Sequence, residues 1–146
     1  MTLMTKPQYE NILYVKSSES LEYELVIQHL THKQHSHLSM KQYIEQLAFQ
    51  FQKNVRTQQK IASSALNVHQ MIPIFLSKSL ILCPLQSQRA TIQYYINITQ
   101  VIAASSHQQA TRIHFNNNLS LIVPIPLNQF VRKWKDAYLL TALMSL

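Results

Sequence analysis

The chain has 146 residues, enough for one domain, and 47% of them are hydrophobic, enough to bury a core. Glycine is absent, which excludes the glycine-rich loops that hold phosphates and the Gly-x-Ser-x-Gly elbow of hydrolases. The single cysteine excludes an internal disulfide framework and a cysteine-based zinc finger. The formal charge is +7, and Asp136 is the only acidic residue after Glu45. This imbalance favours a polyanionic partner such as DNA, with a solvated basic surface as the alternative.

The N-terminal segment predicts a β-hairpin followed by a polar loop. Residues 11–15, Asn-Ile-Leu-Tyr-Val, are typical of a short strand, and residues 21–27 alternate weakly and predict its partner. Residues 29–37 are polar and rich in histidine, so we expect a loop there. Because glycine is absent, we expect Asn, Asp or Ser at turn positions that need a positive φ.

Residues 40–65 predict one long helix or two short ones, because apolar side chains recur at helical spacing. Ser39 is the predicted N-cap, and Gln42 follows three residues later, as in a capping box. We expect a basic ridge on the opposite face of this helix, from three residues at i, i+3 and i+7: Lys53, Arg56 and Lys60.

The next segment predicts strands. Residues 72–76 and 79–85 are apolar and lie close to prolines, which is typical of short buried strands. Residues 91–103 form the clearest predicted strand, since apolar and polar side chains alternate from Thr91 to Thr99. Residues 112–115 and 119–125 predict a hairpin around three consecutive asparagines.

A terminal helix is predicted over residues 128–144, with Asn128 as its N-cap. The two prolines before it, Pro124 and Pro126, indicate that the preceding strand ends at a sheet edge. The expected inner face of the helix consists of apolar and aromatic residues: Phe130, Val131, Trp134, Ala137, Tyr138 and Thr141.

The predicted fold class is therefore α+β, a mostly antiparallel sheet with a central helix and a C-terminal helix. We expect one domain over residues 1–146, divided into four successive parts. These parts are an N-terminal hairpin and histidine-rich loop (1–38), a helix (39–66), a set of strands (70–127) and the C-terminal helix (128–144).

Five segments occur in an order that resembles one known family. They are Ile72-Pro-Ile-Phe-Leu, Leu80-Ile-Leu-Cys-Pro-Leu85, Arg112-Ile-His-Phe-Asn-Asn, Leu119-Ser-Leu-Ile-Val-Pro-Ile125 and Asn128-Gln-Phe-Val-Arg-Lys-Trp-Lys-Asp-Ala-Tyr138. This succession resembles the ComK family of competence transcription factors from low-GC Gram-positive bacteria. The similarity covers about residues 70–140 and extends weakly over residues 11–68.

The resemblance implies a transcriptional regulator of DNA-uptake genes that reads AT-rich boxes, mainly through the minor groove and the phosphates. The alternative is a ComK-derived interaction module that has lost DNA binding and modulates a full-length relative. Two departures keep this alternative open. Residues 47–60 lack the cysteine and the glycines of the corresponding family segment, and the chain stops soon after its last helix.

The candidate DNA contacts are basic residues from three segments. Lys53, Arg56 and Lys60 are the first choice, as phosphate or minor-groove contacts, against a solvated helix face. Arg112 precedes the asparagine turn and is a second candidate. The terminal helix supplies the remaining candidates: Arg132, Lys133 and Lys135. For these the alternative is a pair between Arg132 and Asp136, with the others solvated.

Four histidines make up a His-x-x-His-x-x-His-x-His cluster: His29, His32, His35 and His37. Imidazoles bind Zn²⁺, Ni²⁺ or Cu²⁺, so a metal-responsive protein is a third hypothesis, although chance histidines in a polar loop are the simpler interpretation. Cys83 is predicted to be a buried packing residue. No catalytic motif is apparent, so we expect neither an enzyme nor a cofactor.

The partners expected are double-stranded AT-rich DNA and a second copy of the chain, as a dimer or higher oligomer. RNA polymerase and a full-length ComK relative are further candidates. No apolar run approaches the ~20 residues of a membrane span, and no secretory signal is visible. We therefore expect a cytoplasmic protein associated with the nucleoid and no membrane partner.

Overall fold

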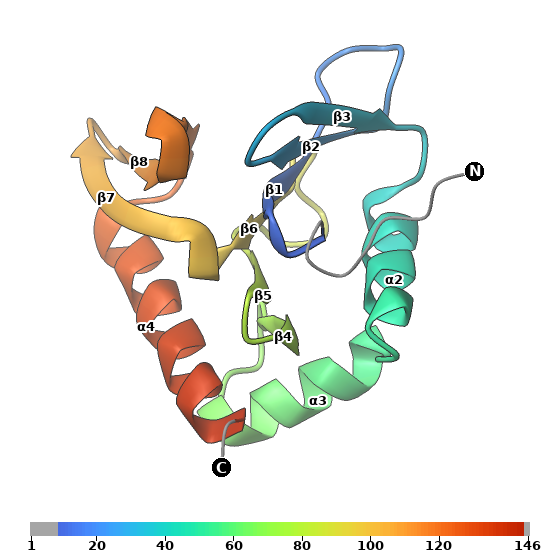
Figure 1. Ribbon diagram of the computed structural model, residues 1–146. Coiled ribbons are helices and arrows are strands. Elements are labelled where there is room, and N and C mark those ends of the chain that lie inside the picture. The colour runs from blue at the N-terminus through green and yellow to red at the C-terminus, as the bar shows by residue number, and fades with distance from the viewer. Residues whose placement is uncertain (1–8, 145–146) are drawn as a thin grey trace.

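The computed structural model describes residues 9–144, and these residues have the α+β fold that the sequence predicts (Figure 1). Two antiparallel sheets are present in this range, one of six strands and one of three. In Figure 1 the helix α4 and strands β7 and β8 lie to the left of the six-stranded sheet, while α2 lies to its right and α3 below.

The six-stranded sheet has the order β3-β2-β1-β6-β5-β4. Its strands are β1 (Ile12–Ser17), β2 (Leu25–His29), β3 (Lys33–Ser36), β4 (Ile74–Ser77), β5 (Leu80–Pro84) and β6 (Tyr94–Asn97). The predicted hairpin of β1 and β2 is confirmed. The predicted histidine loop is wrong in part, because β3 pairs with β2 and extends the sheet over Lys33–Ser36.

Apart from the polar edge strand β3, the strands of this sheet are mostly buried on both faces, which explains why they are apolar without clear alternation. On β5, Ile81 and Cys83 face a cluster shared with α4 and the second sheet, whereas Leu80 and Leu82 face a cluster shared with α2. Cys83 is buried, as predicted.

The predicted helical segment consists of two helices, α2 (Met40–Gln50) and α3 (Val55–Leu66). The capping box is confirmed: Ser39 Oγ accepts a hydrogen bond from Gln42 N, and Gln42 Oε1 accepts one from Ser39 N. Between the helices, Gln52 has a positive φ and Asn54 caps α3. The predicted continuous basic ridge is therefore wrong, because Lys53 lies in the turn and not on α3.

The long strand predicted over residues 91–103 is also divided. β6 ends at Asn97, a 3₁₀ turn follows at Ile98–Gln100, and β7 (Val101–His107) then enters the second sheet. Asn97 is fully buried and stabilises this change of direction. Its Nδ2 donates to the carbonyls of Ile12 (2.8 Å) and Ser79 (3.0 Å), and its Oδ1 accepts from Ile81 N (3.2 Å).

The second sheet has the order β7-β8-β9, with β8 at Ala110–Phe115 and β9 at Ser120–Val123. The asparagine turn between β8 and β9 is confirmed as a 3₁₀ turn, Asn116–Asn118, in which Asn117 and Asn118 have positive φ. Asn67 is another such position, but Gln52, Met71 and Gln108 also adopt positive φ. The expectation that only Asn, Asp or Ser would do so is wrong.

The terminal helix α4 spans Leu127–Met144. Asn128 is not its N-cap, because it lies inside the helix and its Oδ1 accepts only from Gln129 N. The carbonyl of Pro126 accepts from the amides of Gln129 and Phe130 and so begins the hydrogen bonding of the helix. The buried side chains are Phe130, Ala137 and Leu140, so the inner face is rotated from the prediction and Tyr138 is 67% exposed.

Candidate nucleic-acid interface

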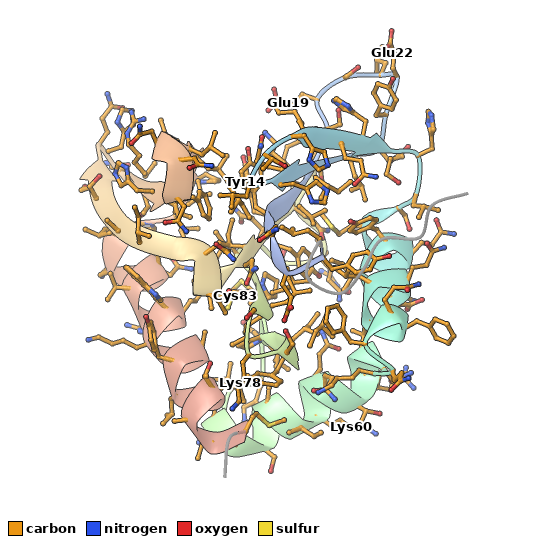
Figure 2. All side chains as sticks on the ribbon, viewed as in Figure 1. Tyr14, Glu19, Glu22, Lys60, Lys78 and Cys83 are labelled. Atoms are coloured by element: carbon orange, nitrogen blue, oxygen red, sulfur yellow. The ribbon has the colours of Figure 1, made fainter. Side chains whose placement is uncertain are left out.

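Charge is distributed unevenly along the molecule. Figure 2 places Glu19 and Glu22, in the loop between β1 and β2, at one end, and Lys60 and Lys78 at the opposite end. The lower end of the molecule in this view, where Lys60 of α3 and Lys78 lie, is therefore away from this acidic loop. An anionic ligand that approaches this end meets little repulsion from Glu19 and Glu22.

A groove of about 890 Å³ opens between α2, α3 and the edge of the six-stranded sheet. We call it the α2–α3 groove. Its lining residues come from α2, the α2–α3 turn, α3, β4, β6 and the loop before β6: Ser39, Met40, Lys41, Ile44, Glu45, Phe49, Lys53, Asn54, Val55, Arg56, Gln59, Ile74, Gln88, Gln93 and Tyr95. Three cations and several amide side chains thus face one hollow that contains a single carboxylate.

Two of the three first-choice residues meet in this groove. Lys53 is half-buried, and its Nζ lies 5.2 Å from the centre of the Phe75 ring, so a cation–π contact holds the amine in place. Arg56 is exposed on the first turn of α3. Lys60 lies one turn further along α3, outside the groove, and points to solvent at the lower end of the molecule (Figure 2).

Sequence reasoning did not identify the other polar residues of the groove. Lys41 lies just after the N-cap of α2, and its spacing from Lys53 gives no indication that the two share a surface. Gln93 lies in the loop before β6 and is held there by two hydrogen bonds. Its Nε2 donates to the carbonyl of Gln88 (2.7 Å), and its backbone N donates to Ser17 Oγ (2.9 Å). This loop leads into β6, and the pairing of β6 with β1 and the bond to Ser17 fix its position.

An exposed aromatic side chain lies at the groove. Phe49, near the C-terminal end of α2, is 76% exposed, although Phe51 two residues later is buried. Phe49 also borders a second, shallower hollow that is otherwise lined by three glutamines and Glu45. A large apolar ring in these polar surroundings is available to contact a ligand in the groove.

The remaining predicted contacts lie elsewhere. Arg112 is on β8, in the second sheet, and Arg132 and Lys135 are exposed on the first half of α4. Lys133 is half-buried because it shares the inner face of α4 with Phe130 and Ala137. Burial lowers the pKa of Lys133, and the neighbouring Cys83 and Asp136 partly oppose that shift. These residues do not join the α2–α3 groove.

The four histidines lie in two separate groups, His29 with His32 and His35 with His37. The His29 and His32 rings stack with their centres 4.3 Å apart, and His29 Nε2 lies 2.8 Å from Gln34 Oε1. His35 and His37 instead pack against the ring of Tyr23. Among the described residues, no three His, Cys, Asp or Glu side chains are placed to hold a metal ion.

Comparisons with known proteins give no further guide to the function. No family model, curated protein or solved structure matches the chain. Within residues 9–144, no helix has both the length and the apolar character that crossing a membrane requires.

Proposed function

We propose that the protein binds AT-rich double-stranded DNA through the α2–α3 groove and regulates the transcription of genes next to the bound sites. The observation that carries this proposal is the convergence of Lys41, Lys53 and Arg56 on one groove with a single carboxylate, Glu45. Lysine and arginine side chains neutralise phosphates and release counterions, which supplies most of the affinity of such proteins for DNA. The resemblance to the ComK family points to DNA-uptake genes as the targets and to the nucleoid as the location.

The amide side chains of the groove suit a reader of the minor groove. Asn and Gln act as both donors and acceptors, and the minor groove presents mainly acceptors at A·T pairs. Asn54, Gln59, Gln88 and Gln93 lie beside the cations. A narrow A-tract groove has an enhanced negative potential that favours an inserted Arg or Lys, so Arg56 would prefer AT-rich sites.

The exposed Phe49 adds the expectation that the bound DNA is bent. Proteins that bind the minor groove often insert an apolar side chain between base steps and bend the duplex. Phe49 is the exposed aromatic side chain that borders the groove. We expect it to contact the bases or sugars next to the phosphates that Lys53 and Arg56 bind.

The test is fluorescence anisotropy with two labelled duplexes of equal length, one with A-tract boxes and one GC-rich, from low to physiological salt. The proposal predicts tighter binding of the AT-rich duplex that persists at physiological salt. Equal binding of both duplexes that disappears as salt rises would mean generic attraction to a basic protein, and no binding at low salt would overturn the proposal.

The second candidate function, a protein-interaction module, is favoured by a different surface. On α4, Tyr138, Leu139 and Leu143 are 67%, 52% and 37% exposed and lie one turn apart or side by side. Large apolar side chains that cluster on one helix face are typical of contact surfaces. If the AT-rich duplex does not bind, mixed-oligomer formation with a full-length ComK relative becomes the test, with Tyr138→Ser and Leu139→Ser as the variants expected to abolish it.

A further inference from the structure

The two sheets end in four edge strands, β3 and β4 in the larger sheet and β7 and β9 in the smaller one. An edge strand presents unpaired backbone N–H and C=O groups, which pair readily with another chain. Soluble proteins protect such edges with short strands, lysines, prolines or a covering helix. The four edges of this protein differ in how far they are protected.

Three of the edges carry such protection. β3 has four residues and contains Lys33, and β9 has four residues and ends just before Pro124. β4 begins just after Pro73, and helix α3 packs beside it. None of these three edges offers a long, uncharged stretch of free backbone.

β7 is less protected than these three, although helix α4 also packs against it. Its seven residues, Val-Ile-Ala-Ala-Ser-Ser-His, include no proline and no Asp, Glu, Lys or Arg. Most of the strand is exposed, and Ile102 is 59% exposed. An irregularity between Val101 and Ala103 limits regular pairing to the five residues from Ala103 to His107. Among the described residues, no other backbone group bonds to the outer edge of this stretch.

The register with β8 shows which groups are free. β7 and β8 are joined by a two-residue turn, Gln108 and Gln109, and a turn of this length makes His107 and Ala110 a hydrogen-bonded pair. Bonded and non-bonded pairs alternate in an antiparallel ladder, so Ser105 is also bonded to β8. The N–H and C=O groups of Ala104 and Ser106 therefore point away from the sheet.

We propose that β7 pairs with β7 of a second copy of this chain, in antiparallel register about a two-fold axis at Ser105. Ala104 of each copy then faces Ser106 of the other, and these two pairs exchange four backbone hydrogen bonds. The two three-stranded sheets become one sheet of six strands. This proposal goes beyond DNA binding and does not depend on it.

A second copy suits this edge because the free backbone groups are symmetric about Ser105, so that Ala104 of one copy meets Ser106 of the other on both sides of the axis. Two molecules of net charge +7 repel each other, so they associate most easily where neither presents a formal charge. In the proposed register the cross-strand neighbours are Ser with Ser, Ala with Ser, and Ala with His. Ser105 lies opposite Arg112 in the β7–β8 ladder, so the two side chains are on the same face of the sheet. Because the two Ser105 residues also lie opposite each other in the proposed dimer, Arg112 of both copies is on one face of the joined sheet.

A cysteine cross-link tests the register. The Ser105 pair is of the non-hydrogen-bonded type, with Cα atoms about 4.5 Å apart, which fits a disulfide. Cys83 is buried, so an introduced thiol is the one that reacts. Under mild oxidation Ser105→Cys is expected to form a covalent dimer, and the matched control Ser120→Cys, on β9, is not. Absence of the Ser105→Cys dimer, or equal cross-linking of both variants, would overturn the proposed register.

Sedimentation velocity over a concentration series tests the association itself, without DNA. The wild type is expected to dimerise reversibly. Ser106→Pro deletes two of the four bonds and is expected to raise the dissociation constant about tenfold or more. If that variant does not fold, Ser106→Lys serves instead, with the exposed Ser64→Lys on α3 as the control for added charge. A protein that is monomeric throughout, or a dimer that Ser106→Lys leaves unchanged, would refute the proposal.

Discussion

Replacing Asn97 with alanine is expected to remove a large part of the stability of this fold. The side chain is fully buried and bonds to three backbone groups in two other segments, the carbonyl of Ile12 in β1 and the groups of Ser79 and Ile81 at the start of β5. In Asn97→Ala the Ile12 carbonyl and the Ile81 N–H lose these bonds. The Ser79 carbonyl keeps the Thr99 hydroxyl at 2.8 Å.

Each of the two groups left unsatisfied costs about 1–3 kcal/mol, so the free energy of unfolding should fall by about 2–6 kcal/mol. The total for a domain of this kind is about 5–15 kcal/mol. With a urea m-value of about 2 kcal/mol/M, the unfolding midpoint should fall by about 1–3 M.

The assay is urea unfolding followed by the fluorescence of Trp134, the only tryptophan in the chain. The control is Asn128→Ala, an exposed asparagine on α4 whose loss should change the midpoint little. A midpoint for Asn97→Ala within about 0.5 M of the wild type would refute the reasoning. It would mean that the break between β6 and β7 does not depend on this side chain.

Three further predictions concern single residues. Burial raises the pKa of the Cys83 thiol to about 12, so a thiol reagent should label it only as the protein unfolds, and fast labelling of the folded protein would contradict its burial. Burial lowers the pKa of His29 below its usual 6.5, so the unfolded state binds more protons below that pH and the free energy of unfolding should fall as the solution is acidified. When urea unfolding is measured at several pH values, the free energy of unfolding should fall less on acidification for His29→Gln than for the wild type. Equal falls in the two proteins would exclude a contribution of His29 to the acid sensitivity. Phe49→Ala should weaken binding of the AT-rich duplex several-fold without changing the urea midpoint, and unchanged affinity would remove Phe49 from the interface.

Elements fixed by local chemistry could be predicted from the sequence. The capping box of Ser39 and Gln42 involves residues three apart, and the turn at Asn117 depends on the tolerance of asparagine for positive φ. The alternation from Thr91 to Thr99 corresponds to the two faces of β6, with Tyr94 and Ile96 in one cluster and Tyr95 in the other, but the strand ends at Asn97. Asn97 Oδ1 caps the following 3₁₀ turn by accepting from Thr99 N and Thr99 Oγ1, which is a local contact. The bonds that Asn97 makes to Ile12, Ser79 and Ile81 join residues 16 to 85 positions away, and these leave no local pattern in the sequence.

The candidate site could be predicted only in part. Lys53 and Arg56 are close in sequence and could be grouped, whereas Lys41 and Gln93 reach the same groove through the packing of α2 and the pairing of β6 with β1. Both interpretations of Lys133, a DNA contact and a solvated side chain, place it on the outer face of α4. The spacing of Phe130, Ala137 and Leu140 places it on the inner face instead.

The central claim, that the α2–α3 groove binds DNA, is tested most directly by comparing two variants that lose the same charge. One carries Lys41→Gln, Lys53→Gln and Arg56→Gln in the groove. The other carries Lys33→Gln, Lys78→Gln and Lys135→Gln, all exposed and outside it. Anisotropy with the AT-rich duplex at physiological salt should show at least a tenfold (about 1.4 kcal/mol) loss of affinity for the groove variant and a clearly smaller loss for the other. Equal losses in the two variants would contradict the account, since net charge and not the groove would then determine binding.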